Sequence, residues 1–87
     1  MKQKEIVIKN KTGLHARPAS EFVKAAYNFK SNIIVKKGEI EINGKSIMGI
    51  LTLAASYNTR IIIIADGEDE DKAIEVLSKI LETEEKA

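Results

Sequence analysis

The spacing of apolar residues along the chain alternates between the period of a helix and that of a strand. Apolar residues recur every three or four positions between residues 16 and 28, which predicts an amphipathic helix there. The apolar face of this helix consists of Ala19, Phe22, Val23 and Ala26. Short apolar or alternating runs predict strands at residues 6–8, 33–35, 39–42 and 60–65.

Two further helices are predicted in the second half of the chain. Ser46 is a good N-cap for the first of them, and Asn58 suits the left-handed position that closes it. Asp69 is the expected cap of the last helix. The apolar faces are formed by Ile47, Ile50, Leu51 and Ala54 in one helix and by Ala73, Leu77, Ile80 and Leu81 in the other.

The predicted order is therefore β-α-β-β-α-β-α, in a chain of 87 residues that has room for a single domain, residues 1–87. A sheet covered by helices on one face is the natural two-layer solution for so small a core, which makes the fold class α+β. A ferredoxin-like sheet would share the first six elements, so the pattern alone leaves both arrangements open.

Composition narrows the classes of function. The 14 basic and 13 acidic residues give a net charge of +1, which does not favour nucleic acid as a partner. The chain has no cysteine, which excludes disulfides and thiolate metal sites. The acidic run at residues 66–71 lacks the glycine at the sixth loop position and the distal glutamate of an EF-hand loop, so we expect no bound metal ion. We expect no cofactor either. No long apolar run predicts a signal peptide or a membrane span, and we expect a cytoplasmic protein.

The only histidine, His15, lies three residues before the only proline, Pro18. Proline suits the first turn of a helix, so His15 is expected just ahead of a helix N-terminus, where N–H groups favour an anion. Arg17 adds a forked cation suited to phosphate. These positive surroundings disfavour the imidazolium and leave the ring neutral and nucleophilic. The arrangement fits a histidine that carries a phosphoryl group, and the alternative on the residues alone is an ordinary loop histidine without a function.

The run Gly13-Leu14-His15-Ala16-Arg17-Pro18-Ala19 resembles the active-site signature of the HPr family, the histidine-containing phosphocarriers of the bacterial sugar phosphotransferase system. The Lys45-Ser46-Ile47-Met48-Gly49 stretch and the Gly67-Glu68-Asp69-Glu70 turn are similar to that family too, so the resemblance covers essentially the whole chain. It implies an open-faced β-sandwich, with an antiparallel sheet in the order 1-4-2-3 and three helices on one face.

The resemblance also implies a carrier rather than an independent catalyst. Phosphorylated enzyme I would transfer its phosphoryl group to Nδ1 of His15, with Arg17 stabilising the charge. The group would then pass to sugar-specific enzyme II components, such as an enzyme IIA. We expect a monomer, with neither nucleic acid nor a membrane among its partners.

Ser46 has two compatible roles. As an N-cap it is expected to contribute about 1 kcal/mol to stability. In Gram-positive HPr proteins the serine of this motif is phosphorylated by a regulatory kinase. The resemblance therefore implies a regulatory phosphosite at Ser46, with an HPr kinase/phosphorylase and a catabolite-control transcription regulator as partners.

No charged residue occurs from Ile47 to Tyr57. A surface helix buries only one stripe, so Ile47, Met48 and Leu51 are expected to face water and, together with Leu14, to bind partner proteins. The alternative is that Met48 is an ordinary core residue.

Two other functions stay open on the residues alone. A small acyl-phosphate hydrolase on a similar scaffold would release phosphate with no partner protein present. A purely regulatory HPr-like protein would carry no phosphoryl group, although the presence of His15 argues against that reading.

Strand alternation assigns only aliphatic residues to the centre of the outer sheet face, where HPr proteins often have threonine or serine. We favour the interpretation that these residues strengthen cross-strand packing. The alternative is a second contact surface that gives a dimer. The residues are Val7, Ile34, Ile62 and Ile64.

Overall fold

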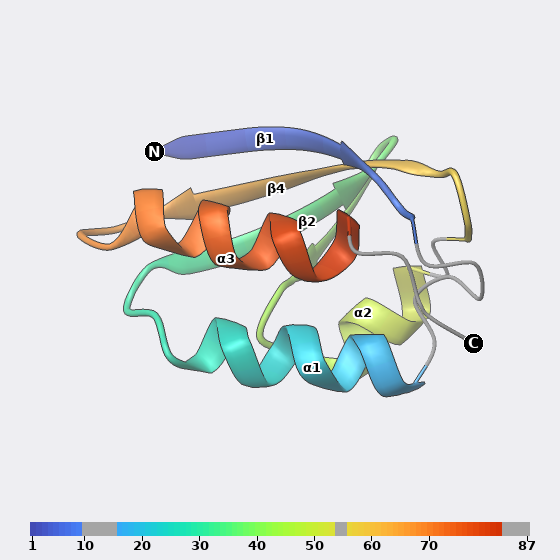
Figure 1. Ribbon diagram of the computed structural model, residues 1–87, viewed down its shortest axis with the longest axis horizontal. Coiled ribbons are helices and arrows are strands. Elements are labelled where there is room, and N and C mark those ends of the chain that lie inside the picture. Colours follow the sequence, from blue (N-terminus) through green and yellow to red (C-terminus); the bar gives the residue numbers. More distant parts are fainter. Residues whose placement is uncertain (10–15, 54–55, 83–87) are drawn as a thin grey trace.

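The computed structural model describes residues 1–9, 16–53 and 56–82. Four strands form one antiparallel sheet in the order β1-β4-β2-β3, and three helices lie together on one of its faces (Figure 1). The predicted open-faced sandwich is therefore confirmed. The elements are β1 (Lys2–Val7), α1 (Ala16–Tyr27), β2 (Asn32–Lys37), β3 (Ile40–Asn43), α2 (Ile47–Leu53), β4 (Arg60–Asp66) and α3 (Glu70–Glu82).

Strand β1 begins at Lys2, four residues before the predicted start at Ile6. Its first four residues are exposed and have no apolar alternation, because β1 is an edge strand that pairs only with β4. Two of its lysines reach α3 instead. The Nζ atom of Lys2 lies 3.1 Å from Oδ1 of Asp71, and that of Lys4 lies 3.3 Å from Oε1 of Glu82. Backbone pairing with β4 and these ion pairs therefore hold the first half of β1 in place without buried apolar side chains.

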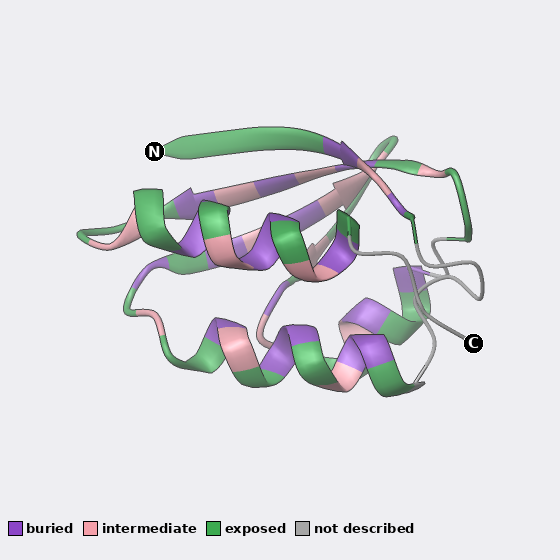
Figure 2. Cartoon of the chain, in the orientation of Figure 1, coloured by how far each residue is buried: buried purple, intermediate pink, exposed green. Residues whose placement is uncertain are grey.

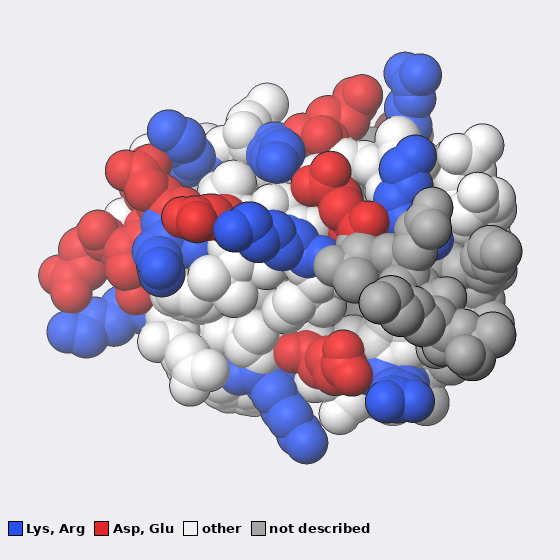
Figure 3. Space-filling view, viewed as in Figure 1, with Lys and Arg blue, Asp and Glu red and all other residues white. Residues whose placement is uncertain are grey.

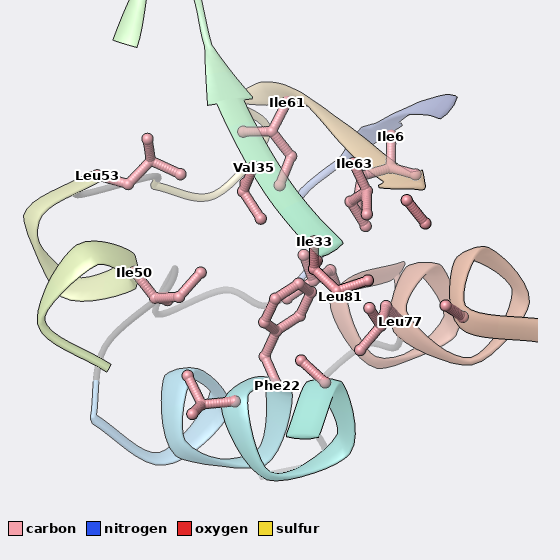
Figure 4. Packing of buried hydrophobic residues seen from close by; sticks show 14 of the residues in the cluster. Ile6, Phe22, Ile33, Val35, Ile50, Leu53, Ile61, Ile63, Leu77 and Leu81 are labelled. Atoms are coloured by element: carbon pink, nitrogen blue, oxygen red, sulfur yellow. The ribbon is translucent and has the colours of Figure 1, made fainter. Parts of the chain in front are cut away.

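The hydrophobic core fills the space between the sheet and the helices (Figure 2). Phe22 of α1 extends toward the sheet, where Ile33 and the α3 residues Leu77 and Leu81 surround its ring (Figure 4). Every member of the predicted face of the first helix is buried.

The predicted face of α2 is wrong in part. Ile50 is buried as predicted, but its buried companion is Leu53, three residues further on. Ile47 and Leu51, which helical spacing groups with Ile50, are exposed instead, as the expected partner surface requires. A helix of seven residues touches the core through one narrow stripe, so only two of its side chains are covered. The predicted member Ala54 lies outside the described residues.

The two faces of the sheet divide as the alternation predicts. Ile33, Val35, Ile61 and Ile63 are buried beneath the helices. The outer-face residues Val7, Ile34, Ile62 and Ile64 are half-buried. Ile34 lies directly opposite Ile64 in the pairing of β2 with β4, and Ile62 lies between Glu5 and Lys36. The outer face therefore has a small apolar centre with polar neighbours.

Asp69 joins the start of α3 to the loop that precedes β2. Its carbonyl oxygen accepts the N–H of Ala73 at 2.9 Å, which confirms Asp69 as the cap position. Its carboxylate instead accepts hydrogen bonds from the backbone N–H groups of Lys30 and Ser31 and from the Ser31 hydroxyl. These bonds, led by that from the Ser31 hydroxyl, lower the pKa of the Asp69 carboxyl.

Asn58 adopts the predicted left-handed conformation, with φ of 71°. That it closes α2 stays a prediction, because residues 54–55, between the end of α2 at Leu53 and Asn58, lie outside the described residues. The N–H of Asn58 donates to the carbonyl of Ile8 at 2.8 Å, so it also secures the segment after β1. Within the described parts of the chain, no helix is long and apolar enough to cross a membrane. The same residues contain no group of three or more histidine, cysteine, aspartate or glutamate side chains that could hold a metal ion.

Candidate functional site

Helix α1 begins at Ala16, one residue after His15. Pro18 is buried in its first turn, where a residue without an N–H costs no hydrogen bond. The first turn carries no acidic side chain, so no carboxylate of that turn competes for its N–H groups. His15 and Leu14 lie outside the described residues, so their roles remain predictions.

Arg17 stands on the outer side of this first turn. Its side chain is 82% exposed, and its Nε atom lies 3.8 Å from Oε1 of Glu21, one helical turn further on. The guanidinium is therefore accessible to a ligand from solvent while it lies near a carboxylate of its own helix.

Ser46 caps α2 as predicted. Its Oγ atom accepts the N–H of Gly49 at 3.1 Å, and its carbonyl accepts the N–H of Ile50 at 3.0 Å. The residue is half-buried, and its position is set by the turn that leads out of β3.

Gly44 fixes that turn against the sheet. Its N–H donates to the carbonyl of Ile33 at 2.7 Å, and a Cβ atom at this position would lie 2.4 Å from Cγ2 of Ile33. Only glycine allows so close an approach. The backbone just before Ser46 is thereby held on β2.

Lys45 connects the end of α1 to the start of α2. Its Nζ atom donates to the carbonyl oxygen of Phe29 at 2.8 Å, two residues beyond the end of α1. Its backbone N–H donates to Oδ1 of Asn43 at 2.9 Å. The sequence places Lys45 in a motif but does not indicate this link, because the partner is a main-chain carbonyl distant in sequence.

Four large apolar side chains are exposed around α2, and we call them the α2 patch: Tyr27 (68% exposed), Ile47 (38%), Met48 (68%) and Leu51 (37%). The expected exposure of Ile47, Met48 and Leu51 is confirmed, and Met48 is not a core residue. Tyr27 is absent from the sequence prediction, although its position four residues after Val23 places it at the edge of the apolar stripe of α1.

A hollow of about 540 Å³ separates the end of α1 from the start of α2. Tyr27 and Met48 of the α2 patch line it together with Ser46, so the patch and the Ser46 hydroxyl share one surface. On the face seen in Figure 3, acidic and basic side chains are intermixed over α1 and α3, without an extended field of one sign. The α2 patch is thus an exposed apolar surface, of the kind that commonly marks a contact with another protein.

Comparison with known proteins identifies relatives that match almost the whole chain. The sequence profile PTS-HPr, described as "PTS HPr component phosphorylation site", matches residues 2–83. The HPr-like protein Crh of Bacillus subtilis is 43% identical over 84 residues, which cover 97% of this chain and 99% of Crh. The phosphocarrier protein HPr of Buchnera aphidicola is 51% identical over 81 residues, covering 93% of this chain and 95% of that protein.

Solved structures agree with this relationship. A crystal structure of HPr from Thermoanaerobacter tengcongensis superposes with a TM-score of 0.91 at 49% identity, covering 94% of this chain and 92% of that one. A dimer of HPr from the same organism gives a TM-score of 0.74, with 94% of each chain covered. A domain-swapped dimer of Bacillus subtilis Crh gives 0.75 at 43% identity, with 93% of each chain covered. Relatives of this chain therefore form dimers, which weakens the expectation of a monomer.

Proposed function

Because the chain belongs to the HPr family of phosphocarrier proteins, which carry phosphoryl groups and are not independent catalysts, we propose that it carries a phosphoryl group on His15. Enzyme I of the phosphotransferase system supplies the group, and a sugar-specific enzyme II component accepts it. The observation that carries the proposal is the position of the only histidine, directly before α1 and two residues before the exposed Arg17.

The transfer exchanges one N–P bond for another. The Nδ1 lone pair of neutral His15 attacks phosphorus, and the N–P bond to the donor histidine of enzyme I breaks. The donor ring keeps the electron pair of that bond and becomes a neutral imidazole, while His15 becomes a phosphorylated imidazolium that retains its Nε2 proton. The transition state is stabilised mainly by positioning and electrostatics, for which this chain supplies the N-terminal N–H groups of α1 and the Arg17 guanidinium.

The relatives of this chain include the HPr-like protein Crh as well as HPr, so a purely regulatory role is the main alternative to the carrier role. His15 favours the carrier role, because a regulatory protein needs no nucleophile at this position. The hydrolase alternative receives no support from any of the relatives described above.

Ser46 is proposed as a regulatory phosphosite for an HPr kinase/phosphorylase. Two observations support the proposal: Ser46 lines a hollow at the surface, and it adjoins the α2 patch. A phosphate there would add about two negative charges beside apolar side chains that dock partners. A catabolite-control transcription regulator is the proposed reader of this form.

The α2 patch, with Leu14, is proposed as the docking surface for enzyme I and enzyme IIA. Exposed apolar side chains on a small protein commonly mark such surfaces, and methionine adapts to several partners. The role also implies a cytoplasmic location. A monomer is the proposed carrier form, because a partner must reach α1 and α2 together.

Incubation with purified enzyme I and phosphoenolpyruvate, followed by intact mass measurement, tests the carrier role. We expect a gain of about 80 Da, one phosphoryl group, that is labile in acid and stable in alkali. The His15→Ala variant should fold normally and gain nothing. Unchanged uptake by His15→Ala, or no uptake by the parent protein, would contradict the proposal.

A further inference from the structure

Glu21 is an isolated acid in a basic part of the chain. Between Glu5 and Glu39 it is the only acidic residue, whereas the same interval contains seven lysine and arginine residues. Among the described basic residues of this interval, Arg17 forms an ion pair with it, with its Nε atom 3.8 Å from Oε1 of Glu21. The single carboxylate of this region therefore lies beside the cation proposed to bind the phosphoryl group.

The geometry of α1 makes this pairing a property of the helix. Residues four apart lie on the same side of an α-helix, and the two side chains are 82% and 60% exposed. The buried face of α1, with Phe22 and Ala26, points the other way into the core. Neither charge is needed for packing, so both are available to respond to a third charge nearby.

A guanidinium that binds a phosphoryl dianion has to reduce its interaction with a carboxylate. If the Arg17–Glu21 interaction is strong in the unphosphorylated protein and weaker in the phosphorylated protein, it stabilises the unphosphorylated form relative to the phosphorylated form. The Glu21 charge therefore raises the free energy of the phosphorylated form relative to the free form, which makes the phosphoryl group easier to pass on.

We propose that Glu21 is a positioning residue that holds the Arg17 guanidinium in the unphosphorylated protein and thereby increases the phosphoryl-transfer potential of phosphorylated His15. This inference rests on the proposed carrier function. It concerns the equilibrium between the two forms of the protein, not the rate at which enzyme I docks.

A competition experiment measures that equilibrium directly. Parent protein labelled uniformly with ¹⁵N is phosphorylated, freed of phosphoenolpyruvate, and mixed with an equal amount of unlabelled Glu21→Gln protein and a trace of enzyme I. The enzyme only equilibrates the phosphoryl group between the two proteins, so an effect of Glu21 on docking cancels. Intact mass then gives the phosphorylated fraction of each protein.

The Glu21→Gln variant should hold the larger share of phosphoryl group, with an exchange constant of roughly 1.4 to 5, the range that exposed ion pairs span. The preference should shrink as salt is added. The matched control is Glu75→Gln, which removes one carboxylate from an exposed pair of the same spacing on α3, between Glu75 and Lys79. That variant should share the group evenly with the parent.

Repeating the competition between Arg17→Ala and the double variant Arg17→Ala/Glu21→Gln tests whether Glu21 acts through Arg17. Even sharing there supports the proposal, whereas an unchanged preference for the Gln protein would mean direct repulsion and would overturn it. Equal sharing between the parent and Glu21→Gln would also overturn it. A parent protein that takes up no phosphoryl group would refute the carrier function itself, together with this inference.

Discussion

The backbone N–H and the side-chain hydroxyl of Ser31 both donate to the carboxylate of Asp69, across 38 residues of sequence. The two donors belong to the loop before β2, and the acceptor is the cap of α3, so the contact ties two parts of the fold together. Because the donors favour the charged carboxylate, they lower its pKa in the folded protein.

This contact predicts acid sensitivity. A carboxyl whose folded pKa is depressed contributes stability that is present above its unfolded pKa, near 3.8, and is lost as the pH falls through the folded pKa. Asp69→Asn should therefore lower the melting temperature at pH 7, and the difference from the parent should narrow below about pH 4. Thermal melts across this pH range provide the measurement. The control Asp71→Asn, in the same turn of α3, should lower the melting temperature less than Asp69→Asn does at pH 7. If the difference in melting temperature between the parent and Asp69→Asn is the same at every pH, the prediction is contradicted.

Replacing Arg17 by alanine should slow phosphoryl transfer without removing the acceptor. We expect the transfer rate to fall by roughly tenfold or somewhat more. The loss should stay below the roughly hundredfold to thousandfold that is typical when an enclosed hydrogen-bond donor is removed, because Arg17 is largely exposed. Rapid-quench measurement of transfer from phosphorylated enzyme I provides the test, with Lys72→Ala on α3 as a control for loss of a positive charge. Transfer within about twofold of the parent would mean that Arg17 is ordinary surface.

Ser46→Asp should weaken the docking of enzyme I while α2 stays capped. Aspartate is a good N-cap, so the melting temperature should change little. Its charge beside the α2 patch should raise the apparent KM for this protein in phosphoryl transfer. Ser46→Asn is the matched control, since it keeps a capping side chain without the charge. Equal KM values for the Asp and Asn variants would argue against electrostatic control at this position.

The outer sheet face should matter for stability rather than for assembly. Ile34 lies directly opposite Ile64, and Ile62 lies next to this pair on the same face, two residues before Ile64. Cross-strand pairs contribute roughly 0.2–1 kcal/mol each. The variant Ile34→Thr/Ile62→Thr should melt several degrees lower, at about 4–8 °C per kcal/mol for a domain of this size. Sedimentation should show a monomer before and after the change, with phosphoryl transfer unaltered. A concentration-dependent dimer that the double variant abolishes would contradict this interpretation.

The order of elements could be predicted because each has its own local signal. The spacing around Phe22 and the cap at Ser46 depend on neighbours in sequence, and the structure confirms both. The left-handed conformation of Asn58 is confirmed too, whereas its N–H bonds to Ile8, a partner that the sequence does not indicate. The start of β1 could not be predicted, because the partners of Lys2 and Lys4 belong to a helix near the other end of the chain.

The candidate site divides in the same way. His15 and Arg17 stand out from sequence alone because their residue types and the nearby proline favour phosphoryl chemistry. Tyr27 is less evident, since its exposure depends on where α2 begins relative to the end of α1. The closeness of Glu21 to Arg17 follows from helical spacing, but its significance becomes visible only when no other acid is found on α1.

The hydrogen bond from Lys45 to the carbonyl of Phe29 affects the entropy of binding at the hollow. It joins the segment that carries Tyr27 to the segment that carries Met48, so the two walls of the hollow are fixed relative to one another before any partner arrives. Because these walls are already ordered, they lose little conformational entropy when a partner docks. A ligand of the hollow therefore binds at a lower entropic cost than on a surface that must first become ordered.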